Sequence, residues 1–148
     1  MCRAHATVRG LIGEVVARAR DKRDIVLDME AGLEHFSRGT ARHVSSFLAV
    51  LEPYYRSMET VRRVAELAKE LGAQHLLVVA NKVRDDGDRS AIAQFCESHG
   101  LSVAAEIPYD PVLLEAERAG KAPFDYRREA PAMRAVSALA EKLRAQTA

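Results

Sequence analysis

Short apolar runs alternate along the chain with segments of helical length, and this alternation limits the fold more than any other feature of the sequence. Segments 58–71 and 88–99 have helical spacing and are followed by Gly72 and Gly100, a residue type that commonly ends a helix. The apolar runs before, between and after them are 24–28, 44–52, 75–80 and 101–107. Strands and helices in this order form right-handed βαβ units. The sequence therefore predicts an α/β fold, a parallel sheet with helices on both faces.

Further helices are predicted near both ends of the chain. Residues 4–20 carry apolar side chains at helical spacing, and a last helix spans about 131–145. Asp110 and Pro111 form a pair that suits the start of a helix running to about Arg118. The length of 148 residues fits a single domain over 1–148.

Composition excludes several classes of protein. The formal net charge is +1, which does not favour a nucleic-acid surface. No apolar run approaches the roughly 20 residues of a membrane span, and the N-terminus lacks the apolar core of a signal peptide. Cys2 and Cys96 are too few for a disulfide framework, so we expect a reducing, cytoplasmic compartment without nucleic-acid or membrane partners.

Candidate binding loops follow the strands, because ligands of such sheets bind at the carboxyl ends of the strands. These loops are 28–40, 52–57, 81–87 and 108–112. Ser57, at the end of the second loop, is predicted to cap the next helix. The phosphate cradle Gly-x-x-x-x-Gly-Lys-Ser/Thr does not occur in the sequence, since Gly120-Lys121 is followed by Ala122 and lacks the first glycine.

Asp28 ends the first apolar run and is followed by Met-Glu-Ala-Gly, which places Gly32 in the turn. In nucleotide hydrolases, a strand that ends in Asp brings its carboxylate to the magnesium ion or the attacking water, and a nearby glycine offers its N–H to the terminal phosphate. Many strands of α/β proteins also end in an Asp that only starts a turn. The strand-Asp pattern alone leaves both interpretations open.

The longer stretch Asp-Met-Glu-Ala-Gly-Leu-Glu-His-Phe-Ser-Arg-Gly-Thr, over 28–40, resembles the second switch region of the accessory ATPases that mature carbon monoxide dehydrogenase. That CooC-type family belongs to the deviant-Walker P-loop class, together with MinD/ParA-type ATPases and nitrogenase iron protein. Asp-x-x-Ala-Gly is common to the class, and the residues after it resemble the maturation branch. The resemblance continues to about residue 145. It implies a P-loop NTPase-like fold that lacks the N-terminal P-loop strand, hence the C-terminal portion of such an ATPase.

The resemblance also assigns roles to residues at the strand ends. Asp28 would serve the magnesium ion and water, and Gly32 the γ-phosphate. Asn81 and Lys82 match the adenine-recognition position, although an Asn also commonly starts a turn. The second base-proximal loop is Pro108-Tyr109-Asp110, where Asp110 is equally suited to cap a helix; both roles can hold at once.

A metal site is implied by Cys2, because the resembled family carries Cys-x-Cys just before its first helix and pools these thiolates from two subunits to bind Ni²⁺ or Zn²⁺. Here the stretch is Met1-Cys2-Arg3, so the upstream Cys is missing. One Cys per subunit supplies two ligands to a dimer, fewer than a closed soft-metal site uses, although His5 could add an imidazole. Cys96 lies among apolar helical positions and is predicted to be a core residue.

The function implied is that of an ATPase portion with Mg²⁺ and ATP or ADP as cofactors. The complete enzyme would couple ATP-driven homodimerisation to nickel insertion, with carbon monoxide dehydrogenase as its client. Without the P-loop we expect little or no hydrolysis from residues 1–148 alone, and apolar sheet edges that a partner chain or a dimer covers. The alternative is a non-catalytic, degenerate ATPase-like module for dimerisation or docking. An unrelated flavodoxin-like domain would fit the strand–helix order but not the stretch 28–40.

Overall fold

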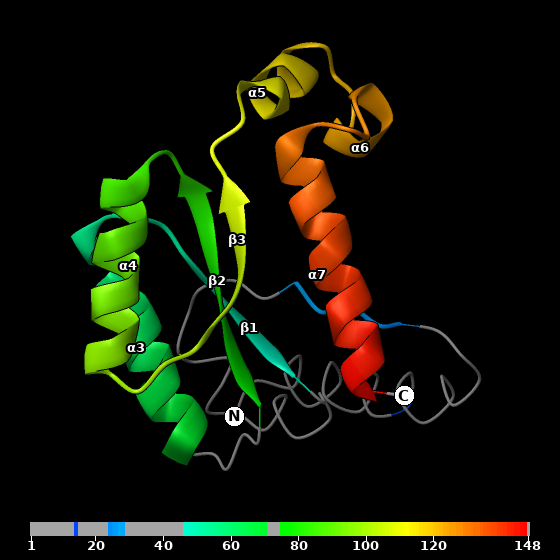
Figure 1. Cartoon of the computed structure of the whole chain (residues 1–148). Coiled ribbons are helices and arrows are strands. Elements are labelled where there is room, and N and C mark those ends of the chain that lie inside the picture. The colour runs from blue at the N-terminus through cyan, green and yellow to red at the C-terminus, as the bar shows by residue number, and fades with distance from the viewer. Residues whose placement is uncertain (1–13, 15–23, 29–45, 71–74, 148) are drawn as a thin grey trace, which may run out of the picture.

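Three parallel strands form the centre of the molecule. The structure is a computed structural model that describes residues 14, 24–28, 46–70 and 75–147 (Figure 1). The strands of the described part are β1 (Phe47–Leu51), β2 (Leu76–Val83) and β3 (Val103–Pro108), and they lie in the order β1-β2-β3. Both neighbouring pairs are parallel, which confirms the predicted sheet type.

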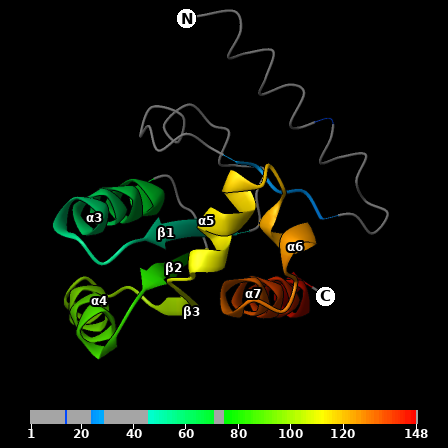
Figure 2. The same cartoon turned by 90° about the horizontal axis from the view of Figure 1, so that it is seen from above.

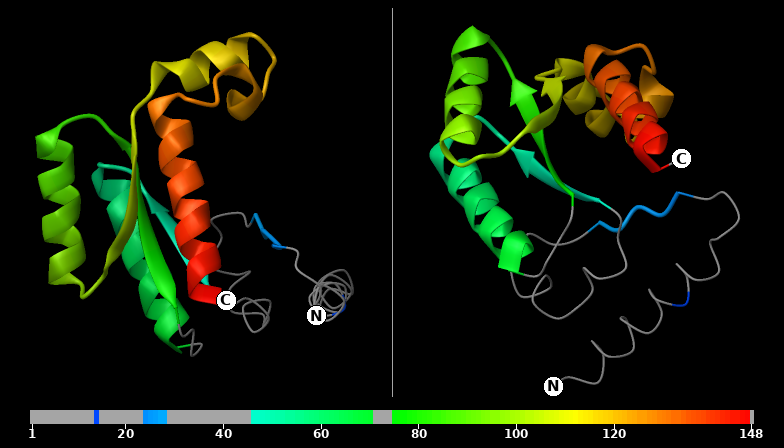
Figure 3. Two further views of the ribbon diagram at one scale, coloured as in Figure 1. Left: turned by 45° about the vertical axis from the view of Figure 1, so that its right-hand side comes forward. Right: turned by 60° about the horizontal axis from the view of Figure 1, so that its bottom comes forward.

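Helices cover both faces of this sheet, as predicted. The chain continues from the strands into α3 (Tyr55–Glu70), α4 (Asp86–Ser98), α5 (Pro111–Arg118), α6 (Pro123–Tyr126) and α7 (Pro131–Thr147). Helices α3 and α4 lie together on one face, against β1 and β2, while α7 packs on β3 from the other face (Figures 2 and 3). No helix in the described ranges is long and apolar enough to cross a membrane.

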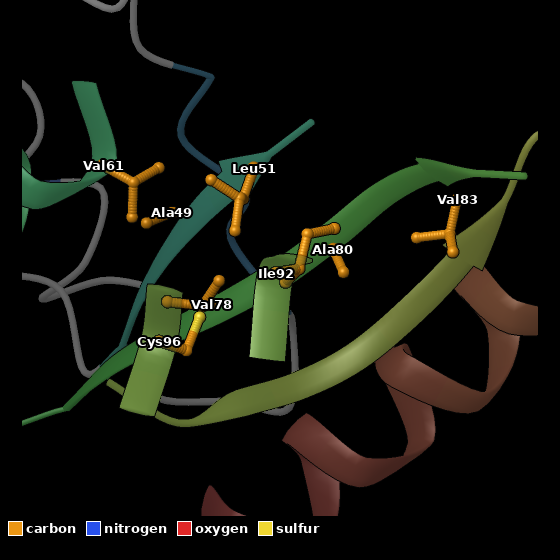
Figure 4. Close-up of a cluster of buried hydrophobic side chains, with 8 residues drawn as sticks. All are labelled: Ala49, Leu51, Val61, Val78, Ala80, Val83, Ile92 and Cys96. Carbon is orange, nitrogen blue, oxygen red and sulfur yellow. The ribbon is translucent and has the colours of Figure 1, made fainter. Parts of the chain in front are cut away.

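The core follows from the alternation of side chains along each strand. Phe47, Ala49 and Leu51 of β1 are buried, whereas Leu48 and Val50 between them are 43% and 55% exposed. The buried side chains of β1 and β2 meet those of α3 and α4 in one cluster: Ala49, Leu51, Val61, Val78, Ala80, Val83, Ile92 and Cys96 (Figure 4). Cys96 is thus a core residue, as predicted, and burial raises the pKa of its thiol.

The apolar surface of β1 agrees with the expected exposed edge. In the described sheet β1 pairs only with β2, so its other edge has no strand beside it. The half-exposed side chains of Leu48 and Val50 project on the face that α3 does not cover.

The prediction of a buried strand over 24–28 is wrong for this structure. All five residues are exposed, Val26 by 91%, and none belongs to a strand. An apolar run becomes a buried strand only where a neighbouring strand accepts its hydrogen bonds, and the described sheet ends at β1 instead. The segment is joined to the end of α7 through Asp24, whose Oδ2 lies 2.7 Å from Arg144 Nε.

Two predicted boundaries also differ. Helix α3 begins at Tyr55, so Ser57 lies inside its first turn and does not cap it. The Ser57 hydroxyl instead accepts a hydrogen bond of 2.9 Å from the N–H of Glu52, which ties the end of β1 to the helix. Strand β2 continues to Val83, through residues predicted to form a polar loop. Apart from Glu14 and Asp28, the predicted helix over 4–20 and the predicted loop over 28–40 lie outside the described residues.

Candidate functional site

The carboxyl ends of the three strands meet at one edge of the sheet, because the strands are parallel. Asn81 near the end of β2 is opposite Ile107 of β3, and Val83 is opposite Pro108. The N–H of Tyr109 donates to the carbonyl oxygen of Val83 at 2.8 Å. The fold therefore brings together the two segments, Asn81-Lys82 and 108–110, that the family resemblance assigns to a nucleotide base.

The amide of Asn81 is a polar group at this edge that has capacity for a ligand. Its residue is half-buried, and its side chain has no hydrogen-bond partner among the residues that the structure describes. A carboxamide presents both a donor and an acceptor, the combination that matches the edge of an adenine base. The geometry thus fits a base, although it does not by itself select one.

Asp110 has a structural role in which both of its carboxylate oxygens take part. Its side chain is 8% exposed, Oδ1 accepts from the N–H of Val112 at 3.0 Å, and Oδ2 accepts from the N–H of Ala132 at 3.1 Å. The predicted helix cap is confirmed, with Pro111 as the first residue of α5. These two bonds hold the loop in place, and Tyr109 beside Asp110 is about half exposed.

Lys82 adopts an unusual backbone conformation, and Glu52 holds its side chain. The φ angle of Lys82 is 56°, a left-handed conformation that costs a non-glycine residue about 1 kcal/mol. Its Nζ lies 2.9 Å from Oε1 of Glu52, the residue after β1. Such partly exposed ion pairs contribute up to about 1 kcal/mol, the same order as the strain. The hydrogen bond to Glu52 is the main reason that the pKa of Lys82 is raised, and the nearby Tyr54 and Tyr109 act in the same direction.

Sequence reasoning missed Glu52 and Tyr54 as members of this edge. Both lie in the loop 52–57, which was predicted as a candidate binding loop but in which only Ser57, as a helix cap, was given a role. Glu52 follows a buried strand directly and precedes a proline, which is the signal that could have identified it. Tyr54 and Tyr109 are each about half exposed, so the edge presents aromatic surface beside the ion pair.

The chain is similar to known ATP-binding proteins. No family model matches the chain. An uncharacterized ATP-binding protein of Methanocaldococcus jannaschii is 37% identical over 123 residues, and the carbon monoxide dehydrogenase accessory protein CooC of Rhodospirillum rubrum is 34% identical over 125 residues. These matches cover 82% and 84% of the chain. The chain is a relative of the CooC-type ATP-binding proteins. It spans about half the length of these curated relatives, 46% of each.

Solved structures agree with a CooC-type chain at the level of the fold. The MinD cell division protein of Aquifex aeolicus superposes with a TM-score of 0.75 at 20% identity, over 90% of this chain and 58% of that one. MinD of Pyrococcus horikoshii, determined with Mg-ADP, gives a TM-score of 0.66 at 21% identity, over 91% and 56%. The predicted P-loop NTPase-like fold class is therefore confirmed.

Of the remaining residues predicted from the CooC-type resemblance, Asp28 is the one that the structure describes. Asp28 is exposed at the end of the segment 24–28, and no hydrogen bond or ion pair joins it to the edge in the described part of the chain. Gly32, Cys2 and His5 lie outside the described residues. Within the described residues, no group of three His, Cys, Asp or Glu side chains could hold a metal ion.

Proposed function

We propose that this chain is the base-binding portion of a CooC-type ATPase, which couples ATP binding and hydrolysis to homodimerisation and to nickel insertion into carbon monoxide dehydrogenase. The observation that carries the proposal is the juxtaposition of Asn81 with the loop 108–110 at the carboxyl edge of the sheet, in a relative of ATP-binding proteins. The client and the metal come from the name of one relative and from the sequence resemblance.

The residues of this edge have different roles in binding the base. The Asn81 amide donates to and accepts from the edge of the adenine ring, and the backbone of Pro108 and Tyr109 lines it. Asp110 keeps that loop in place through its two bonds to the starts of α5 and α7. Lys82 supports the loop end of β2 through its ion pair with Glu52.

Magnesium and phosphate chemistry is assigned to the segment after 24–28. A carboxylate is the oxygen ligand that Mg²⁺ prefers, and Asp28 is exposed and so open to such a ligand. We assign Asp28 to the magnesium ion and the attacking water, and the N–H of Gly32 to the γ-phosphate. Cys2, with Ni²⁺ or Zn²⁺ as cargo, is assigned to a metal site shared by two subunits.

The missing phosphate cradle leads to a test of ATP affinity. The backbone N–H groups and the lysine of a P-loop supply most of the interactions with the phosphates, and this chain contains no such motif. Residues 1–148 alone should therefore bind ATP with millimolar or weaker affinity, as measured by calorimetry. A protein in which the P-loop half of a CooC-type relative precedes this chain is the matched control, and should bind ATP in the micromolar range. Micromolar affinity of residues 1–148 alone would contradict the assignment.

A non-catalytic dimerisation or docking module is the second candidate. The exposed side chains of Leu48 and Val50 beside the unpaired edge of β1 favour it. Base binding separates the two candidates, because a docking module has no need of it. An Asn81-dependent response to AMP supports the nucleotide-binding portion, and its absence supports the module.

A further inference from the structure

Strand β2 contains an irregularity at Lys82 that base recognition by Asn81 does not by itself explain. The register against β3 pairs Asn81 with Ile107 and Val83 with Pro108, so Lys82 is an extra residue on the β2 side, a β-bulge. Its left-handed φ of 56° is a conformation that such bulges usually assign to glycine. Among the described residues, Lys82 is the non-glycine residue with a positive φ.

The bulge shifts the alternation of β2 by one residue. In a regular strand, positions 78, 80 and 82 share a face. Here Val78 and Ala80 lie in the buried cluster, and the next member along the strand is Val83 (Figure 4). Lys82 between them and Val83 is exposed. The bulge therefore returns the strand to the core after Asn81. Asn81 therefore lies on the face opposite the core, and the core position after it is occupied by Val83 instead of Lys82.

Glu52, the residue after the neighbouring strand β1, holds this conformation. Its Oε1 lies 2.9 Å from Lys82 Nζ, and its own N–H is bonded to Ser57 Oγ at 2.9 Å. The first turn of α3 thus fixes Glu52, and Glu52 fixes Lys82. The free energies given above for the strain and for an exposed ion pair are of the same order, so the pair can offset the strain.

We propose that the Glu52–Lys82 ion pair is a positioning device: it stabilises the left-handed bulge in β2 and so sets the direction from which the Asn81 amide meets a purine base. Glu52 and Lys82 are positioning residues in this scheme, and Asn81 makes the contact. The inference rests on the proposed function for its purine ligand. The effect of Glu52 on the position of the Asn81 side chain can be measured without any ligand.

The test follows the Asn81 side-chain amide of residues 1–148 by ¹⁵N nuclear magnetic resonance, first alone and then titrated with AMP and with GMP. Glu52→Gln and Lys82→Ala both remove the ion pair and leave a side chain that opposes φ of 56°. Both should move the Asn81 resonances and weaken AMP binding roughly fivefold, with a smaller preference over GMP. Lys82→Gly removes the same pair but relieves the strain, so its Asn81 resonances should return toward those of the parent chain.

Glu106→Gln is the matched control, because it removes another ion pair near this end of the sheet, that of Glu106 with Arg89 Nη2 at 2.7 Å. It should leave the Asn81 resonances unchanged, and thermal melting of every variant checks that each is folded. Unmoved Asn81 resonances in Glu52→Gln and Lys82→Ala would overturn the positioning role. If AMP fails to perturb Asn81 in the parent chain while those variants still move the amide, the proposed function is wrong and the positioning of Asn81 stands.

Discussion

Asp110 shows how one buried carboxylate can organise the end of a sheet. Asp110→Ala removes a helix cap from α5 and leaves the N–H of Ala132 without its partner, which together should cost about 2–4 kcal/mol of unfolding free energy. Urea denaturation followed by circular dichroism measures the loss. Asp85→Ala is the control: Asp85 caps α4 through a single exposed bond to the N–H of Asp88, and its loss should cost about 1 kcal/mol. Equal losses would mean that the bond to Ala132 contributes nothing.

The two bonds of Asp110 also mark what the sequence could predict at the residue scale. The bond to Val112 is local, and the Asp-Pro pair at the start of an apolar helical pattern predicted it. The bond to Ala132 spans 22 positions and exists only because α7 begins beside α5 in the folded chain. Glu52 and Lys82 were equally hard to connect, since no local pattern pairs residues from neighbouring strands.

Helix α3 carries an ion-pair cluster whose effect depends on pH. Glu59 accepts from Arg62 and Arg63, and the hydrogen bonds from Arg62 first and Arg63 second lower its pKa to about 2 from the ordinary 4.5. A pKa that is lower in the folded state adds stability above the ordinary value, and this stability is lost as pH falls from 4.5 towards 2.

Glu59→Gln should therefore lower the melting temperature near neutral pH, with the difference from the parent chain shrinking below about pH 4. Glu70→Gln, at the end of the same helix, is the control, because Glu70 forms no ion pair among the described residues. Its melting temperature should follow that of the parent at every pH. A Glu59→Gln difference that stays constant from pH 7 to pH 2.5 would exclude the ion-pair explanation.

At the element scale, patterns that depend only on the segment itself were predicted well. The apolar runs within 44–52, 75–80 and 101–107 are strands, and the helical segments between them are helices. The exceptions depend on neighbours. Residues 24–28 have the composition of a strand but no strand beside them in the described sheet. Strand β2 continues past the end of its apolar run at residue 80, because β3 still pairs with it at Asn81 and Val83.

At the scale of the whole molecule, the metal hypothesis predicts a change of assembly. If Cys2 is a ligand shared by two subunits, Ni²⁺ or Zn²⁺ should convert residues 1–148 from monomer to dimer, as measured by light scattering. Cys2→Ser should abolish the effect. Cys96→Ser should not, because Cys96 is buried in the core and unable to reach a shared site. An equal response of the two variants would remove Cys2 from the site.

The division of roles between Asp28 and Asn81 can be tested only where both the base and the phosphates are bound, in a protein that carries a P-loop half before this chain. Asp28→Asn keeps the shape of the side chain and removes its charge. A group that acts mainly in the transition state changes turnover more than affinity, so hydrolysis should fall by roughly two orders of magnitude or more while Mg-ATP affinity changes little.

Asn81→Ala should show the opposite pattern in the same protein. The base loses a donor and an acceptor in both the ground state and the transition state, so ATP affinity and the preference over GTP should fall while turnover at saturation stays near that of the parent. Steady-state kinetics with ATP and GTP, together with calorimetry, measure both quantities for each variant. Normal hydrolysis by Asp28→Asn, or the same kinetic change in both variants, would contradict the assigned roles. The fold would be unaffected by that outcome, because the sheet and its carboxyl edge rest on strand pairing and not on these two side chains.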